Sequence, residues 1–571
     1  MTELVIYAKY VGIMYLRTVK RKNRDGETVE YYQLAHNERH PVTRNSTTRI
    51  IHNFGRADQL DRDQLVRLCN SIARVCGLQV SDPLSSEPQD SQLDFPKDFQ
   101  IIRTLDFGTV WVIEALWERL GIGKTLRDMG KSQGMNHAYE RALLAMTANR
   151  LCEPESKLGV WERWLSKVYM PGCHDLKRDH MYEAMDFFHN HAADIEKTIF
   201  FHTANLFNLK VDLIFYDTTT ASFSIDQEDE STDESDEAAI RKYGRSKSGV
   251  WTPQVIVALA VTTEGLPVRS WVFDGNTTDV NTIEKVRSDL RGWNLNRALF
   301  VADSGMNSQT NKEELARACG KYLLATRMAS VAEVKRDVLS KRGRYSKIKD
   351  NLQVKEVIIG DGERRKRYIL CYNPKEAKRQ EKHRQAVVER LEKEFEKHPR
   401  KQATAKWAIA LLDSKRYSRY LTISKNNTVR IDRSKIRDAK RYDGKWVLET
   451  NDDTISMEDA ACGYRGLMVI ERCFRSLKRT QIKMCPMYHW LPRRIETHVK
   501  ICVLALLIER VAELACGKPW GRICHALERL QITKFQTPDR SFFKRNEIQP
   551  DVNNILNKLK ISAPKSILAV E

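Results

Sequence analysis

Residues 211–217 read VDLIFYD and residues 298–303 read ALFVAD, and each of these apolar runs ends in an aspartate. Short apolar runs bounded by turn residues are typical of buried strands. Two helical stretches follow Asp279 and precede Lys321. Three further strand-like runs are QVIVALAV (254–261), LPVRSWVF (266–273) and KYLLAT (321–326). The order of three strands, a helix, a strand, a helix and a strand predicts an α/β sheet.

The rest of the chain divides by composition around this sheet. The first hundred residues predict a strand-containing module, with a short helix near 61–75 and a polar linker at 81–96. Apolar spacing predicts helices from 101 to 205, and a charge-dense insertion interrupts the sheet-and-helix unit. The expected segments are 1–100, 101–205, 206–325 (first part of the core), 326–457 (insertion domain), 458–515 (second part of the core) and 516–571 (C-terminal region).

The charge balance favours a polyanionic partner. The formal net charge is +20, and 42% of the residues are hydrophobic and 30% charged. Nucleic acid is the first expectation, an anionic membrane surface the second, and a merely basic, solvated surface remains open. A mean hydropathy of -0.52 and an interrupted uncharged run at 248–263 argue against a membrane span. The 12 cysteines form no CxxC pair, which favours reduced thiols in a cytoplasmic protein.

Two aspartates at the ends of predicted strands are candidate metal-binding residues. Asp217 closes the run VDLIFYD and is followed by three threonines, and Asp303 closes ALFVAD before Ser304 and Gly305. The ends of strands in α/β sheets are where sites are usually built. Paired carboxylates suit a hard divalent cation such as Mg²⁺. An aspartate after a strand is also a common turn residue or helix cap, so both interpretations stay open for this pair.

A third acid lies on a predicted amphipathic helix, YRGLMVIERCFRSLK (464–478). At about 100° per residue, Tyr464, Arg475 and Lys478 lie within about 40° of Glu471. Leucine, isoleucine and phenylalanine residues form the neighbouring stripe, which would dock the helix. The alternative is an ordinary surface ion pair between Glu471 and Arg475, which stabilises a helix by only about 0.2–0.5 kcal/mol.

Asp217, Asp303 and Glu471, with the words around them, resemble the DDE transposases of bacterial insertion sequences. The resemblance is to the branch with a YREK signature and an insertion before the glutamate. It rests on FYDTTTASF (215–223), RSKSGVWTPQVIVALAV (245–261), GLPV (265–268), DGNTTD (274–279), ADSGM (302–306), the 464–478 stretch and MYHWLPRRIETHVKICVLALLI (487–508).

This resemblance implies a ribonuclease H-like catalytic core in which Asp217, Asp303 and Glu471 hold two metal ions, Mg²⁺ with Mn²⁺ as a substitute. The implied activity is cutting and joining of insertion-sequence ends by phosphodiester hydrolysis and transesterification. The implied partners are double-stranded DNA, as terminal inverted repeats and as target, and a second copy of the chain in a synaptic homodimer. The protein would act in the cytoplasm on the nucleoid, without a membrane partner.

The signature Y-x2-R-x3-E-x6-K is matched by Tyr464, Glu471 and Lys478, but its arginine position holds Leu467. Arg475 is the physical substitute, because it shares the face of Glu471. The DNA-binding residues expected from these arguments are Tyr464, Arg475, Lys478, Arg245, Lys247, Arg493 and Arg494.

The N-terminal module and the helical region at 101–205 are expected to recognise DNA ends. An acidic run at 226–237 is expected to be a solvated loop. Two alternative functions remain open from the sequence. One is a ribonuclease H-like nuclease without strand transfer. The other is a basic DNA-binding regulator without catalysis.

Overall fold

The structure is a computed structural model of the 571-residue chain. It describes residues 14–22, 28–39, 46–57, 60, 67–69, 71–72, 100–134, 138–229, 238–247, 249–295, 297–398 and 402–570. The chain divides into two compact units, Met1–Phe95 and Pro96–Glu571.

The N-terminal unit is a three-stranded antiparallel sheet in the order β1-β2-β3. Val29 and Ala35 of the central strand are buried. Strands occur in this unit, as the sequence predicted. The predicted linker at 81–96 and most of the helix near 61–75 lie outside the described residues. The strands are β1 (Met14–Lys22), β2 (Thr28–Arg39) and β3 (Ser46–Arg56).

The larger unit is built on a mixed sheet, and its five central strands are those expected from the sequence. Their order is β8-β7-β5-β9-β10. β7 is antiparallel to β5 and β8, whereas β9 is parallel to β5 and β10. The strands are β5 (Leu213–Ser222), β7 (Trp251–Val261), β8 (Pro267–Asp274), β9 (Leu299–Ala302) and β10 (Lys321–Thr326).

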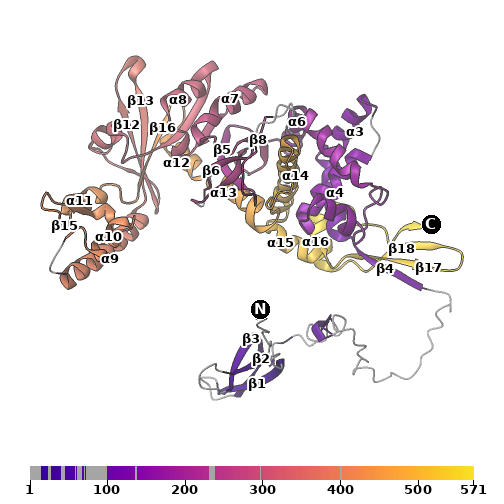
Figure 1. The fold of residues 1–571 in the computed structure, drawn as a ribbon. Helices are drawn as coiled ribbons and strands as arrows, with labels where there is room; N and C mark the ends of the chain where they lie inside the picture. The colour runs from indigo at the N-terminus through magenta and orange to yellow at the C-terminus, as the bar shows by residue number, and fades with distance from the viewer. Residues whose placement is uncertain are drawn as a thin grey trace, which may run out of the picture. The chain divides into compact units, whose positions relative to one another are not determined.

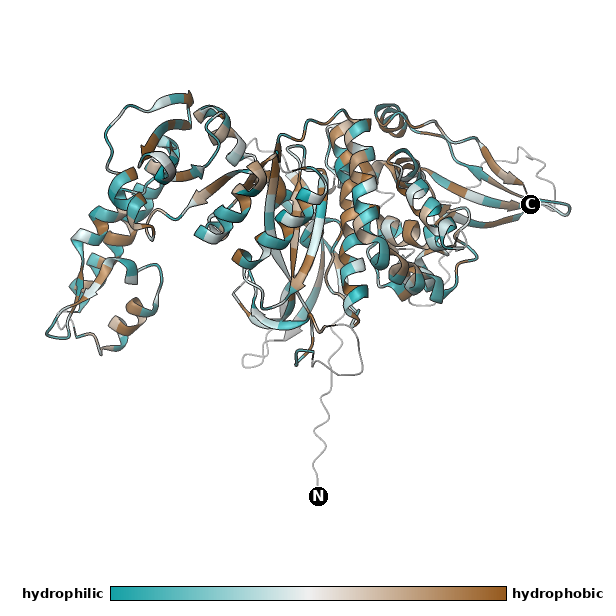
Figure 2. Cartoon of the chain, turned by 90° about the horizontal axis from the view of Figure 1, so that it is seen from above, coloured by the Kyte–Doolittle hydropathy of each residue, from teal (hydrophilic) through white to brown (hydrophobic). Residues whose placement is uncertain are grey.

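Helices cover both faces of this sheet because its strands are apolar on both sides. On one face, α7 (Ile283–Gly292) and α8 (Gln309–Ala316) pack on Ile214 and Phe300. On the other, Phe215 joins the core that contains α13 (Met468–Arg475) and α14 (Pro492–Cys516). α14 is buried around most of its circumference. Figure 2 shows hydrophobic residues concentrated on the central strands and the long helix beside them.

The predicted insertion adds strands to the same sheet. β16 pairs with β10 in antiparallel register, and three further strands continue outward in the order β13, β12, β11 (Figure 1). Among its described residues the insertion has one core in its helical part, built on Leu391, Phe395 and Tyr420, and a second beside its strands, built on Val357 and Tyr368. The elements are β11 (Ser346–Lys349), β12 (Leu352–Ile359), β13 (Lys366–Tyr372), α9 (Pro374–Lys397), α10 (Lys406–Asp413), β14 (Leu421–Ile423), β15 (Val429–Ile431), α11 (Arg433–Lys440) and β16 (Lys445–Thr450).

The helical region at 101–205 packs on α14, with one strand that the sequence did not reveal. β4 (Gln100–Asp106) pairs with β17, so the start of this unit and its C-terminal region form one sheet in the order β19-β18-β17-β4. The remaining elements are α2 (Gly108–Arg119), α3 (Ile122–Ser132), α4 (Ala138–Cys152), α5 (Lys157–Gly159), η2 (Val160–Trp164), α6 (Arg178–Leu206), α15 (Trp520–Leu527), β17 (Gln531–Gln536), β18 (Ser541–Arg545), α16 (Pro550–Lys558) and β19 (Ile567–Val570).

In the described ranges, none of the helices combines the length and apolar character needed to cross a bilayer. The acidic run at 226–237 is described only as far as Asp229. Within that part, Asp229 bonds the Arg241 side chain, and Glu228 accepts from the backbone N–H of Tyr243 in β6 (Lys242–Arg245). The start of the run is therefore attached to the sheet, and its remainder lies outside the described residues.

Gly466 controls how closely α13 approaches the sheet. It lies between α12 (Met457–Arg465) and α13, against Phe215 of β5. A Cβ atom at position 466 would lie 2.6 Å from Cζ of Phe215, whose side chain is 1% exposed. Only glycine leaves room for this contact without moving the helix or the buried ring.

Gly466→Ala is expected to lower the free energy of unfolding by about 1–3 kcal/mol, because the added methyl group overpacks a buried contact. Gly463→Ala is the matched control, since its Cβ would meet Leu213 at no less than 3.7 Å. That control is expected to be neutral or slightly stabilising. Urea denaturation of both variants measures the difference, and equal midpoints would contradict the role of Gly466.

Candidate active site

Asp217 and Asp303 lie at the same level of two neighbouring parallel strands. The pairing of β5 with β9 aligns Tyr216 with Ala302, the residues just before the two aspartates. The sequence predicted that Asp217 ends its strand. In the structure β9 stops at Ala302, but β5 continues to Ser222 because its later residues still pair with β7. Asp217 therefore stands where β5 loses its neighbour β9.

The alternation of side chains along β5 turns Asp217 toward the helix that carries Glu471. Phe215, two residues earlier, packs in the same core as Ile470 and Phe474 of α13. Tyr216 packs in the core on the opposite face. Since strand residues two apart share a face, Asp217 lies on the α13 side of the sheet.

Tyr464 of α12 connects the three predicted acids. Its hydroxyl group donates a hydrogen bond to Oδ1 of Asp303 at 3.1 Å. The pKa of Tyr464 is strongly raised, first by burial and then by the negative charges of Asp303, Asp217 and Glu471. All three carboxylates therefore act on one phenol group, and the structure brings together residues that are far apart in the sequence.

The helix predicted over 464–478 is interrupted twice, which corrects the single continuous face expected from the sequence. α12 ends at Arg465, a turn follows at Gly466, and α13 passes into the π-helical turn η9 (Ser476–Thr480). Lys478 lies in η9, and its ammonium group donates to Oγ1 of Thr219 at 3.2 Å. Lys478 therefore contacts β5 two residues beyond Asp217, and its place beside the three acids stays a prediction.

The Asp217 carboxyl group is in an unfavourable electrostatic environment. Burial, together with the charges of Asp279 and Asp303, raises its pKa to about 6. The backbone N–H of Thr218, which donates to Oδ1 at 2.7 Å, and the Lys247 ammonium act in the opposite direction. Burial is the largest effect and outweighs these two contacts, and a bound cation would stabilise the ionised carboxylate.

Asp279 is a fourth carboxylate that the sequence argument did not single out. It accepts a hydrogen bond from the Thr218 hydroxyl and forms an ion pair with Lys247 at 2.8 Å. Because Thr218 directly follows Asp217, the hydrogen bond to Asp279 fixes the side chain next to Asp217. The signal in the sequence was its place at the end of DGNTTD, a stretch that was noted only as part of the resemblance.

The basic residues predicted to bind DNA are found in three places. Lys247 pairs with Asp279, Lys478 bonds Thr219 of β5, and Arg245 is exposed on β6, the strand that pairs with β7. Arg475 is exposed on α13 and lines a separate hollow of about 490 Å³.

Arg493 and Arg494 lie at the start of α14 and both bond Asp186 of α6. The Asp186 pKa is lowered: burial opposes the shift, but the hydrogen bonds and charges of Arg494 and Arg493 outweigh it. Arg494 also lies 4.9 Å from the ring centroid of Tyr182. These two arginines are therefore partly neutralised and tie α14 to α6.

The donor set suits a hard divalent cation without forming a complete cage. Among the described residues, no three His, Cys, Asp or Glu side chains are gathered closely enough to hold a metal ion. Mg²⁺ commonly uses one or two carboxylates and completes its shell with water and substrate phosphate. Asp217 and Asp303, at one level of paired strands, could supply such oxygen ligands, and the charge of Glu471 on α13 acts on the Tyr464 phenol that bonds Asp303.

Two family models match the chain. Residues 16–83 match the IS1634 family transposase N-terminal domain, and residues 218–507, slightly more than half of the chain, match the Transposase DDE domain. Among solved structures, the chain is similar to piggyBac transposase in a synaptic complex with hairpin DNA, studied by cryo-EM. The identity is 9% and the TM-score 0.31, over 74% of this chain and 70% of that one. No curated protein sequence matches the chain.

Asp217→Asn is expected to raise the free energy of unfolding by about 1–3 kcal/mol in metal-free buffer well above pH 6. Folding raises the Asp217 pKa, so the ionised carboxylate destabilises the folded chain. This destabilisation is absent at a pH below the ordinary pKa of aspartate and reaches its full size at a pH above the raised pKa. The neutral amide avoids that cost. Thermal unfolding measures the change, with Asp212→Asn, an exposed residue just before β5, as control. A less stable Asp217→Asn protein would show that the carboxylate is structural.

Proposed function

The chain belongs to the family of DDE transposases, and we propose that it cuts and joins the ends of an insertion sequence at Asp217, Asp303 and Glu471. The observation that carries this assignment is the parallel pairing of β5 and β9, which brings two aspartates to one level beneath the helix of Glu471. The Tyr464 phenol, influenced by all three acids, supports the same grouping.

The strand order supports a ribonuclease H-like core. Three antiparallel strands, β8, β7 and β5, are followed by the parallel strands β9 and β10, with helices on both faces. In this proposal the core comprises 206–325 and 458–515, and the strands of the 326–457 insertion lengthen its sheet at the β10 edge. α13 then brings the third acid back to the sheet after the insertion.

DDE transposases use divalent metal ions, and we assign Mg²⁺, with Mn²⁺ as a substitute, to Asp217, Asp303 and Glu471. Two such ions would activate the attacking oxygen and stabilise the leaving oxygen of a phosphodiester. The chain's own groups orient the ligands. Tyr464 fixes one oxygen of Asp303, the Thr218 N–H fixes one oxygen of Asp217, and Asp279 holds Thr218 and Lys247.

The DNA partner follows from charge. Lys247, Lys478 and Arg245 border the acids and would contact phosphates on either side of the scissile bond, with Tyr464 beside them. Arg475, Arg493 and Arg494 would extend this contact along α13 and α14. We infer that residues 1–100 and 101–205 read the terminal inverted repeats, and that two copies of the chain join two ends in a synaptic complex on the nucleoid.

Asp217→Asn, Asp303→Asn and Glu471→Gln should each abolish metal-dependent cleavage of insertion-sequence ends, because neutral amides are poor ligands for hard cations. End binding should change little, since it depends mainly on the basic surface. Gel assays of cleavage and strand transfer, with and without EDTA, measure both steps. Asp212→Asn is the control.

Wild-type cleavage by any of the three variants would remove that residue from the proposed site. Cleavage that resists EDTA would contradict the metal mechanism. Cleavage without joined products would identify a nuclease rather than an enzyme of strand transfer.

Lys478→Gln should lower the slope of log K against log salt for end DNA by about 0.9, the value for one lost phosphate contact. Arg475→Gln should do the same if DNA crosses α13. Lys393→Gln on the exposed face of α9 provides the matched loss of charge. Slopes are measured by fluorescence anisotropy, and equal slopes for Lys478→Gln and Lys393→Gln would contradict a phosphate contact at Lys478.

A further inference from the structure

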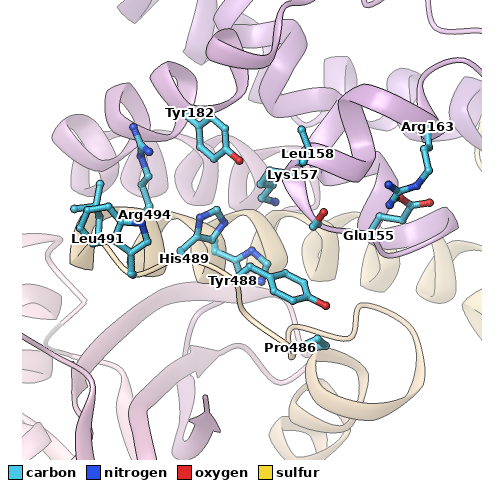
Figure 3. A pocket seen from close by; sticks show the side chains of 13 residues that line it. Glu155, Lys157, Leu158, Arg163, Tyr182, Pro486, Tyr488, His489, Leu491 and Arg494 are labelled. Atoms are coloured by element: carbon cyan, nitrogen blue, oxygen red, sulfur yellow. The ribbon is translucent and has the colours of Figure 1, made fainter. Parts of the chain in front are cut away.

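A cavity of about 560 Å³ lies outside the acidic site, between segments that are far apart in the sequence. One wall comes from residues 155–163 and from Tyr182 of α6, and the other comes from residues 486–498 (Figure 3). We call it the Lys157 pocket. The second wall belongs to the MYHWLPRR stretch, which the acidic site does not use.

Lys157 is the unusual feature of this pocket. Its side chain is 3% exposed, and its ammonium group has no hydrogen-bond partner. Burial, and then the charge of Arg150, lower the Lys157 pKa to about 7. A buried, unpartnered ammonium group is costly, and an anion entering the pocket would remove that cost.

The groups around Lys157 add positive charge. Arg150 is also 3% exposed, and its guanidinium donates to the backbone oxygen of Glu155. The His489 pKa is lowered to about 3, first by burial and then by the charges of Lys157 and Arg494. His489 is therefore neutral and adds no charge to the pocket. Among the described residues that line the pocket, Glu155 supplies the carboxylate, and Arg163 binds it at 2.6 Å.

Two aromatic side chains stand at the rim. Tyr488 is 69% exposed and Trp490 67% exposed, although both are large enough to favour burial. In Figure 3, Tyr488 and His489 face Lys157 and Tyr182 across the pocket. Aromatic faces beside cations are the pattern by which proteins bind single-stranded nucleic acid, since every base has a π face and every nucleotide a phosphate.

The pocket is connected to the acidic site through one continuous stretch of chain. Lys478 contacts Thr219 of β5, and Cys485 lies within hydrogen-bond reach of the backbone of Ser222, the last residue of that strand. The chain then passes directly to Tyr488 and Trp490. A DNA strand leaving the acids along this segment would meet the pocket next.

We propose that the Lys157 pocket binds an unpaired nucleotide of the substrate DNA, with a phosphate beside Lys157 and a base stacked on Trp490 or Tyr488. This inference rests on the proposed function, because it takes DNA as the substrate, but it concerns binding at a separate site. The aromatic rim favours a nucleotide over an acidic peptide segment, which would need only the cations.

Lys157→Met and Trp490→Ala in the full chain test the pocket without any cleavage step. Affinity is measured in EDTA by fluorescence anisotropy, for a single-stranded oligonucleotide and for a blunt duplex of the same sequence. Each variant should weaken single-strand binding about tenfold, equivalent to about 1.4 kcal/mol, and duplex binding less than twofold. Lys157→Met should unfold at the same or a higher temperature, because methionine fills the space without a buried charge.

Lys425→Met, an exposed lysine in the insertion, controls for the loss of one charge, and Trp251→Ala, also 67% exposed, controls for the loss of an indole. Unchanged single-strand affinity in both pocket variants would overturn the proposal. So would an equal loss on duplex and single strand, or a change in oligomeric state alone, which would indicate a protein partner. If Lys157→Met does not fold, the exposed Trp490 decides the outcome. If the wild-type protein prefers single-stranded DNA but does not cleave insertion-sequence ends, and the pocket variants lose that preference, the result counts against the proposed function and not against the pocket.

Discussion

The parallel pairing of β5 with β9 is the contact on which the rest of the site depends. It sets Asp217 and Asp303 at one level, and it ends just where Asp217 needs open space. The second requirement is the close approach of α13, which Gly466 permits against Phe215. The β5–β9 register brings the two aspartates together. Gly466, which has no side-chain methyl group, lets the helix of Glu471 approach the same side of the sheet.

This convergence has an electrostatic cost that the surrounding groups only partly offset. Asp217 is partly buried and lies near two other carboxylates, so its pKa is raised despite Lys247 and the Thr218 N–H. Groups with such perturbed pKa values are concentrated at functional sites. The Lys157 pocket has the opposite excess of charge, because its buried ammonium group has no hydrogen-bond partner. The negative site suits cations and the positive pocket suits phosphates, as an enzyme of DNA requires.

The long helix α14 connects the sheet that carries the aspartates with the helical region beside the Lys157 pocket. It packs on the sheet through the core shared with Phe215, and against α4 and α6 of the helical region. Arg493 and Arg494 at its start hold Asp186 of α6, next to the Lys157 pocket. The insertion is attached in a different way, because its strands continue the sheet beyond β10. Both attachments therefore join a region outside the core to the sheet that carries Asp217 and Asp303.

The sequence by itself determined the five central strands, because apolar runs and their flanking residues are local properties, and it is the source of the proposal that Asp217, Asp303 and Glu471 are the three acids. It did not predict the two interruptions of the 464–478 helix, which are the turn at Gly466 against Phe215 of β5 and the π-helical turn η9. β4, the sheet shared by the insertion and the core, Asp279 and the Lys157 pocket were decided only by the tertiary structure. Each depends on partners more than fifty residues away, as with Asp279 and Thr218, and no local pattern encodes which distant segments will meet.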